Sequence, residues 1–424
     1  MRVITDLHVH SEHSQATGKD LNLANLEKWA RVKGVNLLGT GDFTHPKWIS
    51  EIKQELTDKG EGILYSKSGF PFLLQTEISL VYTQGGKGRR IHHLVYAPDI
   101  DAVKKITDWL LTRGRVDYDG RPIFGIPSPE FVERLKAIDE RIEIIPAHAW
   151  TPWFGALGEN GGFNSIKECF QDMEKHIFAI ETGLSSDPCM NWRISALDKY
   201  TLVSNSDLHS FWPWRMGREA NVFELKDLTY KNIINTIKTQ TGFVETLEVD
   251  PAFGKYHWTG HRACNVSLSP TESKKLNDIC PVCKKKLTVG VEQRVEELAD
   301  RPEGYMKKDA IPFKRIIPLS ELLAQATGKA VSTKGVWERY HKLVTKERTE
   351  LDILLTTPQE ELVKASDERI ASILMANREG KIQVVPGYDG EYGIPQIPGE
   401  APAVRKPSIR PTSDVKQRSL SGFL

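Results

Sequence analysis

The side chains best suited to chemistry are histidines and carboxylates that recur along the first 245 residues. The sequence Asp6-Leu7-His8-Val9-His10 sets two imidazoles at alternate positions. Alternate side chains of a β-strand share a face and lie about 7 Å apart, so His8 and His10 can bind one ion together. Further metal-competent residues follow along the chain: Asp42, Glu77, His92 or His93, His148, Asp207 and His209. Imidazoles and carboxylates without cysteine suit Zn²⁺, Mn²⁺ or Fe²⁺ in a hydrolytic site better than a structural zinc.

The elements that must position these residues alternate between short apolar runs and amphipathic stretches. We expect strands at residues 2–7, 35–40, 72–77, 91–96, 142–147, 177–181 and 201–204, with helices such as 23–33 and 128–139 between them. This alternation predicts parallel strands with helical crossovers, as a barrel or as an open doubly wound sheet. The metal-competent residues lie at or near the carboxyl ends of these strands, where such folds gather their active sites. A glutamate among several histidines can bridge two ions, and paired ions about 3.5–4 Å apart serve phosphoester displacement.

Length and composition narrow the class of protein. A chain of 424 residues, 39% hydrophobic and 27% charged, predicts a globular protein of about two to four domains. No uncharged apolar run approaches the roughly 18 residues that a membrane span needs, and the amino terminus has no secretory pattern. Five cysteines, a low and odd number, do not indicate a disulfide framework, so we expect a cytoplasmic protein.

The net charge of +1 conceals a basic segment in the second half of the chain. Residues 255–345 hold 17 Lys and Arg against 10 Asp and Glu, a net charge of +7. Such a segment favours a polyanion as partner, and DNA is the partner we expect. Helical periods follow at residues 319–327, 336–350 and 358–376, so we predict a helical, basic, DNA-contacting region over residues 296–385.

A second cluster of metal ligands lies in residues 250–295. Cys280 and Cys283 are separated by two residues, and His261 and Cys264 supply an earlier pair with the same gap. Two such pairs are typical of a closed zinc site, which stabilises a fold and performs no chemistry. His257 is the alternative fourth ligand, and the symmetry of the pairs favours His261. A redox C-x-x-C motif is the competing interpretation, but this motif does not follow a strand and open a helix.

The chain ends in a Pro- and Gly-rich stretch followed by an apolar peptide. Six Pro and four Gly in residues 386–414 predict a flexible linker, which we place at residues 386–416. Leu420 and Phe423 then form one apolar plug of a 3₁₀ turn, with Gln417 at its edge. The series Gln417, Leu420, Phe423 and Leu424 resembles the sliding-clamp (PCNA) interaction box, although Leu424 stands where a second aromatic is common. The resemblance implies a clamp-binding peptide at residues 417–424, which would concentrate an enzyme at DNA.

The first 245 residues resemble the polymerase and histidinol phosphatase (PHP) superfamily of metal phosphoesterases. The motifs that carry the resemblance are DLHVH, GDF, Glu77, HHLVY, His148 and SDLH, in this order. The resemblance implies a seven-stranded distorted (β/α) barrel over residues 1–245 that holds two or three Zn, Mg or Mn ions. It assigns His8, His10, Glu77 and Asp207 to the first ion, Glu77, His93 and His148 to the second, and Asp42 and His209 to the third.

Two positions depart from the PHP pattern. Phe43 stands where a histidine ligand is usual, so the carboxylate of Asp42 must substitute for it. Ala16 takes the place of a further histidine, for which His13 is a nearby stand-in. His92 and His93 point to opposite faces of a strand, so only one of them can bind an ion, and the sequence context favours His93.

The order of the parts resembles the endonuclease Q family of DNA repair enzymes over essentially the whole chain. The resemblance implies a nick 5′ to a deaminated base (uracil, hypoxanthine or xanthine) or to an abasic site, with the base extruded beside the metals. Asp207 and Glu77 would hold the ions and His209 would carry a proton, so these three are the expected catalytic residues. A small-molecule PHP phosphatase is one alternative, and a non-catalytic adaptor that joins DNA to the clamp is another.

Overall fold

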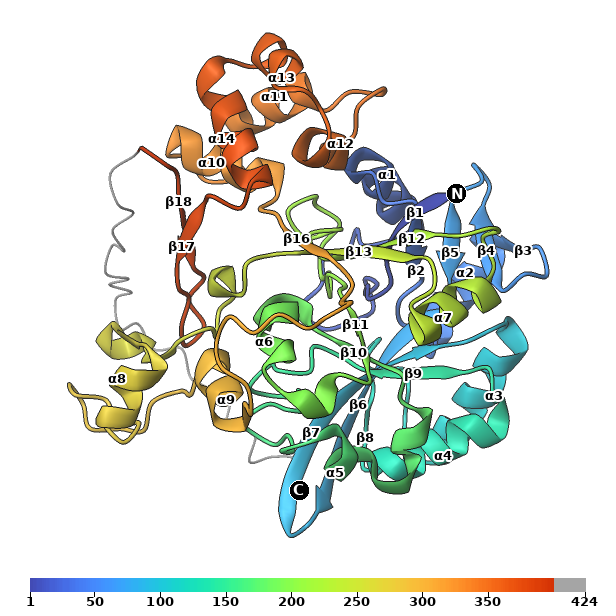
Figure 1. Ribbon diagram of the computed structural model, residues 1–424. Helices are drawn as coiled ribbons and strands as arrows, with labels where there is room; N and C mark the ends of the chain where they lie inside the picture. Colours follow the sequence, from blue (N-terminus) through green and yellow to red (C-terminus); the bar gives the residue numbers. More distant parts are fainter. Residues whose placement is uncertain (400–424) are drawn as a thin grey trace.

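The computed structural model describes residues 1–399 (Figure 1). Its largest sheet has the strand order β16-β13-β12-β1-β2-β5-β4-β3. The parallel centre of this sheet consists of β1 (Arg2–Asp6), β2 (Leu37–Gly39) and β5 (Pro71–Leu73). The outer strands are β12 (Ala220–Glu224), β13 (Phe243–Glu248) and β16 (Phe313–Arg315) on one side, and β4 (Ile63–Ser66) and β3 (Leu56–Asp58) on the other. Of these outer strands, β12 and β4 pair antiparallel to the centre.

A second sheet, in the order β8-β6-β7-β9, contains two long strands, β6 (Gln75–Gln84) and β7 (Lys87–Tyr96). These two strands form an antiparallel hairpin, and β9 (Glu143–Pro146) also pairs antiparallel with β7. The expectation of parallel strands is therefore wrong for β7, which runs antiparallel to both of its neighbours, β6 and β9. The physical reason is the two-residue turn between β6 and β7, where Gly85 and Gly86 have φ of 63° and 73°, which is the geometry of a tight hairpin.

Two shorter parallel pairs complete the strands near the site. The strand β10 (Ala179–Glu181) pairs with β11 (Thr201–Val203), and β8 (Ile123–Phe124) pairs with β6. The helices around the sheets are α1 (Leu23–Lys33), α2 (Pro46–Glu55), α3 (Ile100–Leu111), α4 (Ser128–Ile138), α5 (Ile166–Phe170), α6 (Pro188–Trp192) and α7 (Tyr230–Thr239). The fold is thus mixed α/β, and closure of seven strands into one barrel stays a prediction.

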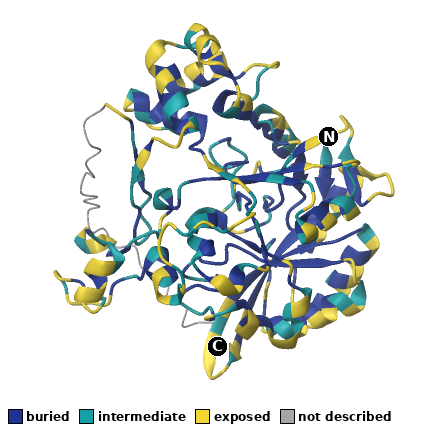
Figure 2. Ribbon diagram, in the orientation of Figure 1, coloured by how far each residue is buried: buried dark blue, intermediate teal, exposed yellow. Residues whose placement is uncertain are grey.

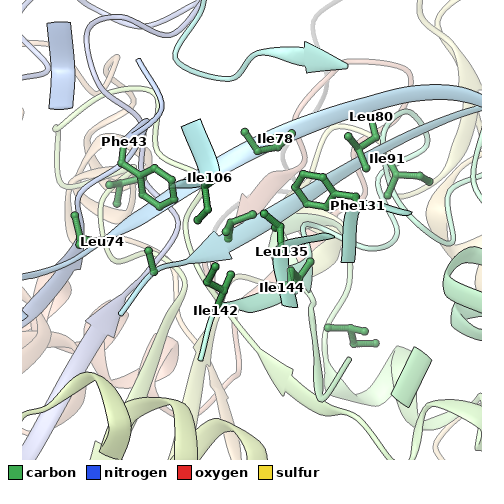
Figure 3. Close-up of a cluster of buried hydrophobic side chains, with 14 of the residues drawn as sticks. Phe43, Leu74, Ile78, Leu80, Ile91, Ile106, Phe131, Leu135, Ile142 and Ile144 are labelled. Atoms are coloured by element: carbon green, nitrogen blue, oxygen red, sulfur yellow. The ribbon is translucent and has the colours of Figure 1, made fainter. Parts of the chain in front are cut away.

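The core forms where helices press an apolar face onto the second sheet. Figure 3 shows Ile106 of α3 and Phe131 and Leu135 of α4 with Ile78 and Leu80 of β6, all of them fully buried. Burial follows the strands and the inward faces of the helices, and the outer faces of α3 and α4 are exposed (Figure 2). This packing fixes the strands rigidly, so side chains at their carboxyl ends have defined positions.

Residues 250–298 form a small unit around the two Cys/His pairs. Its elements are β14 (Thr259–His261), β15 (Val266–Leu268), α8 (Pro270–Lys275) and α9 (Val291–Leu298). The core of this unit consists of Val266, Cys280 and Leu287. Three such residues bury too little apolar surface to hold a unit by themselves, so the unit depends on packing against its neighbours, to which α9 contributes Val291 and Val295.

A lobe of five helices follows, at the top of Figure 1. Its helices are α10 (Leu319–Thr327), α11 (Lys334–Leu343), α12 (Glu350–Leu355), α13 (Gln359–Ala365) and α14 (Glu368–Arg378). The expected helix 319–327 is confirmed. The expected helices 336–350 and 358–376 are wrong in extent, because Thr349 caps α12 with a capping box and Asp367 caps α14, so each stretch is interrupted.

The Pro- and Gly-rich stretch begins as ordered structure. The strand β17 (Gln383–Val385) pairs antiparallel with β18 (Ile394–Gln396), and Tyr388 and Ile397 are buried. The prediction of a flexible linker is therefore wrong for residues 386–399, because the glycines of this stretch permit close packing of its backbone on residues 252–254. Within the described residues, none of the helices has the length and apolar character that crossing a membrane requires.

Candidate metal centre

Side chains from distant parts of the chain converge on one centre. His8 and His10 follow β1, Glu77 lies on β6, and Asp207 follows β11; their ligand atoms lie within 4.8 Å of one another. A second group, with the same spacing, consists of Glu77, His92 of β7 and His148, which follows β9. Glu77 belongs to both groups. The structure therefore brings the predicted residues His8, His10, Glu77, His148 and Asp207 together.

The carboxylate of Glu77 faces both groups at once. Its Oε2 atom lies 3.3 Å from Nε2 of His10 and 3.6 Å from Nε2 of His8. Its Oε1 atom lies 2.7 Å from Nδ1 of His92 and 3.0 Å from Nε2 of His148. This is the placement of a carboxylate that bridges two ions, and Arg121 fixes it by donating a hydrogen bond of 3.0 Å to Oε2.

The donor set fits divalent metal ions. His8 is fully buried, and its Nε2 atom has no hydrogen-bond partner although Asp207 Oδ1 lies 3.4 Å away. A buried ring nitrogen without a partner is costly unless a cation takes its lone pair. Asp207 shares the site but keeps 28% of its side chain exposed, so the centre opens to solvent on that side.

Buried carboxylates hold the rings of the first group in place. Glu181, at the end of β10, lies 3.0 Å from Nδ1 of His8, and Asp42 lies 3.0 Å from Nδ1 of His10. Such contacts fix the tautomer and direct Nε2 toward the metal. Sequence reasoning missed Glu181 as a site residue, although it ends an expected strand, and missed Arg121, which lies in a loop without a motif.

The third ion expected from Asp42 and His209 is not supported. Asp42 Oδ1 faces His10, and Oδ2 accepts hydrogen bonds from the Ser11 amide (2.7 Å), the Ser11 hydroxyl (2.6 Å) and the Ser14 hydroxyl (2.9 Å). His209 Nδ1 donates to the carbonyl oxygen of Asp207 at 3.0 Å. Within residues 1–399, no group of three metal-competent side chains contains Asp42 or His209. The corrected role of Asp42 is to orient His10.

The choice of His93 as a ligand is also wrong. Nε2 of His93 lies 2.9 Å from the Ser128 hydroxyl, and its ring packs against Phe131 and Phe170 in the core. Burial lowers the pKa of His93 to about 3, so this imidazole is neutral. His92, on the opposite face of β7, reaches Glu77. The reason for the error is that both faces of β7 are buried, so alternation does not show which face meets the site.

The charges of the centre favour a cation. Burial raises the pKa of Glu77, but His92, Arg121 and His8 outweigh this effect and hold the pKa well below its usual value. Burial likewise raises the pKa of Asp207, and His8 and His209 outweigh it. Both carboxylates are therefore ionised at neutral pH. Because they lie beside ring nitrogens, they supply the negative charge that a divalent ion needs.

Three residues of the centre have strained backbones. Asp42, His148 and Asp207 have φ of 44°, 28° and 48°, which lie in or near the left-handed region that favours glycine. Non-glycine residues adopt such angles at a cost of about 1–3 kcal/mol and cluster at functional sites. These backbone conformations thus lower the stability of the fold and direct the three side chains into the site.

The second cluster gathers His261, Cys264, Cys280 and Cys283 within 4.8 Å. The Sγ atom of Cys283 lies 3.3 Å from Nδ1 of His261. His257 lies instead 3.4 Å from Glu292, so the geometry selects His261. Burial raises the pKa of Cys280, but the backbone amides of Cys283 and Val282 lower it to about 6, which favours the thiolate that binds metal.

Two further positions that the sequence singled out, His13 and Phe43, lie outside both clusters. His13 stacks on His45 at 4.4 Å and lies 3.3 Å from Glu51, away from the first group. Phe43 is fully buried in the core. The expected clamp-binding residues, Gln417, Leu420, Phe423 and Leu424, lie outside the described residues.

The chain is similar in sequence and in structure to proteins that have been described before. The family model for the MJ0043 C-terminal domain matches residues 318–381. The crystal structure of the lesion-specific endonuclease PfuEndoQ from Pyrococcus furiosus is 32% identical and has a TM-score of 0.84, covering 94% of this chain and 96% of that one. A structure of endonuclease Q with a 27-mer duplex substrate that carries an abasic lesion at the active site is 32% identical, with a TM-score of 0.85 and 94% and 97% coverage.

The protein MJ0043 of Methanocaldococcus jannaschii is 32% identical over 289 residues, which is 66% of this chain. The chain spans only 34% of the length of that relative. Fold and site together define an α/β protein with a histidine and carboxylate centre suited to two divalent ions. The similarity to the two solved endonucleases extends over nearly the whole of this chain and of theirs. The protein belongs to the endonuclease Q family.

Proposed function

We propose that the protein is a DNA repair endonuclease that nicks one strand 5′ to a deaminated base or an abasic site. The observation that carries the proposal is the placement of Glu77 between two ligand groups, because this arrangement serves phosphodiester hydrolysis. Family membership supports DNA as the substrate, since one relative was solved with a duplex that carries an abasic lesion. The basic segment 255–345 and the helical lobe would bind the DNA backbone.

The residues of the centre have separate tasks. The first ion would be held by His8, His10, Glu77 and Asp207, and the second by Glu77, His92 and His148. When bound, these ions lower the pKa of the attacking water and stabilise the charge that develops on the phosphate and on the leaving 3′ oxygen. Arg121 holds Glu77 in the bridging position.

His209 is placed to move a proton. Its Nδ1 atom donates to the Asp207 carbonyl oxygen at 3.0 Å, so the neutral ring presents Nε2 as an acceptor. His209 lines the same open pocket as Asp207 and His148. We therefore assign to Nε2 of His209 the proton transfer that accompanies strand cleavage, with Asp207 and Glu77 as the other catalytic residues.

Lesion choice would come from extrusion of the nucleotide into a pocket beside the centre. Extrusion costs a few kcal/mol, and least where base pairing is already weakened. In the proposed organisation, residues 1–245 cleave, residues 250–295 form the zinc unit, and residues 296–385 contact DNA. The peptide 417–424 would bind a sliding clamp.

The test is a nicking assay with the metal-loaded protein on duplexes that carry one uracil, one hypoxanthine or one abasic site. The expected product is a single nick 5′ to the lesion, with 3′-hydroxyl and 5′-phosphate ends. Asp207→Asn should abolish nicking and retain DNA binding, whereas Asp227→Asn, at an exposed position away from the centre, should behave as wild type. The same protein is also incubated with histidinol phosphate. Hydrolysis of this ester alone would favour a phosphatase, and inertness toward both substrates with retained clamp binding would favour an adaptor.

A further inference from the structure

An open pocket of about 530 Å³ adjoins the metal centre and extends beyond it. One part of its lining is the centre itself, through His148, Asp207 and His209. The remainder includes Arg215, Arg218, Lys255, Tyr256 and Tyr392, which the metal centre does not use. The volume is within the range of about 300–1,000 Å³ that ligand sites occupy.

Among the described residues, the three cations of this pocket have no carboxylate partner. Within residues 1–399, no carboxylate oxygen lies within 4.0 Å of the charged nitrogens of Arg215, Arg218 or Lys255. Two of them face one aromatic ring, because the guanidinium of Arg215 lies 5.3 Å and Nζ of Lys255 4.7 Å from the ring centre of Tyr392. Burial raises the pKa of Tyr392, and Arg215, Arg218 and Lys255 outweigh it and lower this pKa. The pocket therefore carries concentrated positive charge.

Arg218 is the least solvated of the three. Only 6% of this residue is exposed, its Nη2 atom donates to the Ser206 carbonyl oxygen at 3.2 Å, and its Nε atom has no partner. A buried guanidinium without a counter-charge is costly. Because a second arginine lies nearby, an anion bound between them would supply the missing negative charge.

Two acids that interact with Arg218, Glu321 and Glu219, do not supply this counter-charge. Glu321 of α10 faces Arg215 and Arg218 beyond ion-pair distance, and burial raises its pKa to about 7 although both arginines lower it. Glu219 is fully buried and is hydrogen-bonded to Ser204 and to the Val249 amide. Neither carboxylate closes the pocket to an anion.

The wall that bears Tyr392 is built by the C-terminal hairpin. A Cβ atom on Gly387 would lie 2.0 Å from the Gly254 carbonyl oxygen, and one on Gly393 would lie 2.2 Å from that of Ala252. Only glycine permits the hairpin to pack this closely on residues 252–254. This contact places Tyr392 opposite Lys255, so two segments distant in sequence assemble one pocket.

We propose that Arg215, Arg218 and Lys255, with Tyr392, bind one non-reacting phosphate of the DNA strand that the metal centre cleaves. Guanidinium and ammonium groups in a partly buried site are the donors that proteins use for phosphate. Phosphate contacts set the register of a strand, so this subsite fixes which phosphodiester reaches the centre. The proposal rests on the proposed function, because it assigns a substrate group to a pocket of the same site.

The test combines side-chain and substrate changes. In the double variant Arg215→Gln, Lys255→Gln the buried Arg218 is kept, and the matched control is Lys226→Gln, Lys231→Gln at exposed positions. Single-turnover nicking is measured on an abasic-site duplex whose phosphodiesters are replaced singly by neutral methylphosphonates. Wild type and control should slow about 10–100-fold at one non-scissile position. The double variant should already be slower on the unmodified duplex and show a salt slope smaller by about one. At that position it should lose less than wild type, because only Arg218 still contacts the phosphate.

Other outcomes overturn the subsite. A double variant that is as sensitive as wild type at the same position would show that the phosphate is bound elsewhere. If wild type cleaves no lesion duplex, the proposed function fails, and the subsite is judged from calorimetric binding of thymidine 5′-monophosphate. Binding at least 10-fold weaker in the double variant than in the control would retain the subsite, and equal binding would overturn it. Thermal unfolding of all variants shows that they are folded.

Discussion

The neighbours His92 and His93 provide the sharpest test of the site geometry. Nδ1 of His92 lies 2.7 Å from the bridging Glu77, whereas His93 points into the core toward Phe131 and Phe170. His92→Ala should therefore remove a ligand of the second ion. Changes to residues that only orient ligands already cost about 10–100-fold in metal affinity, so loss of a ligand should cost at least as much. Nicking should fall with the lost ion, and the unfolding free energy should change little.

His93→Ala should show the opposite pattern. The fully buried ring leaves a cavity, and the Ser128 hydroxyl loses one partner but keeps Tyr82 at 2.9 Å. Cavity formation at such a site costs about 2–4 kcal/mol, and the lost hydrogen bond about 1 kcal/mol. A protein of about 5–15 kcal/mol stability tolerates this loss, so the variant should fold and retain its metal.

The assay compares metal content per chain, unfolding in urea and the nicking rate for the two variants and wild type. The reasoning is refuted if His93→Ala loses an ion while His92→Ala keeps the full complement. Equal metal loss in both variants would also contradict it, because the structure places only one of the two rings beside Glu77.

Three further predictions follow from buried charges and from the second cluster. Nζ of Lys33, the fully buried last residue of α1, lies 2.7 Å from the Glu350 carboxylate of α12. Lys33→Met should therefore destabilise the protein by about 3–5 kcal/mol in chemical unfolding, and an unchanged midpoint would contradict this. Burial raises the pKa of Glu248, beside the buried Glu219, to about 8. The folded state then keeps a proton that the unfolded state has released, so stability falls between about pH 4.5 and 8, and Glu248→Gln should flatten this fall in melting temperature. Cys283→Ser should release one metal equivalent per chain, and hydrogen exchange should show that residues 250–298 lose protection before the rest of the protein. Retention of that ion would contradict the zinc assignment.

The sequence predicts the residues of the centre better than their partners. His8 and His10 could be found because a strand sets alternate side chains on one face, and His148 and Asp207 because they follow strand ends. The expected strand 72–77 is wrong in extent, because β5 ends at Leu73 and Glu77 lies near the start of β6. The choice between His92 and His93 could not be made, because Ile91 and Val95 enter one core cluster and Leu94 and Tyr96 another. With both faces of β7 buried, the hydrophobic pattern carries no information about which imidazole meets the site.

Features set by long-range packing were also beyond the sequence. The carboxylates Asp42 and Glu181 are equally suited to binding a metal and to orienting a histidine, and only their contacts decide. The Pro and Gly content of the hairpin that bears Tyr392 predicts a flexible linker. The hairpin is ordered instead because it packs on residues 252–254, a contact that composition does not indicate. Composition reports local freedom of the chain, whereas burial of Tyr388 and Ile397 depends on distant partners.

The most direct measurement is anomalous X-ray scattering from crystals of the protein grown with Zn²⁺ or Mn²⁺. We predict one peak among His8, His10, Glu77 and Asp207 and a second among Glu77, His92 and His148, on either side of the Glu77 carboxylate. A fully loaded crystal with ions elsewhere and none bound by Glu77 would contradict the claim that this centre performs the chemistry.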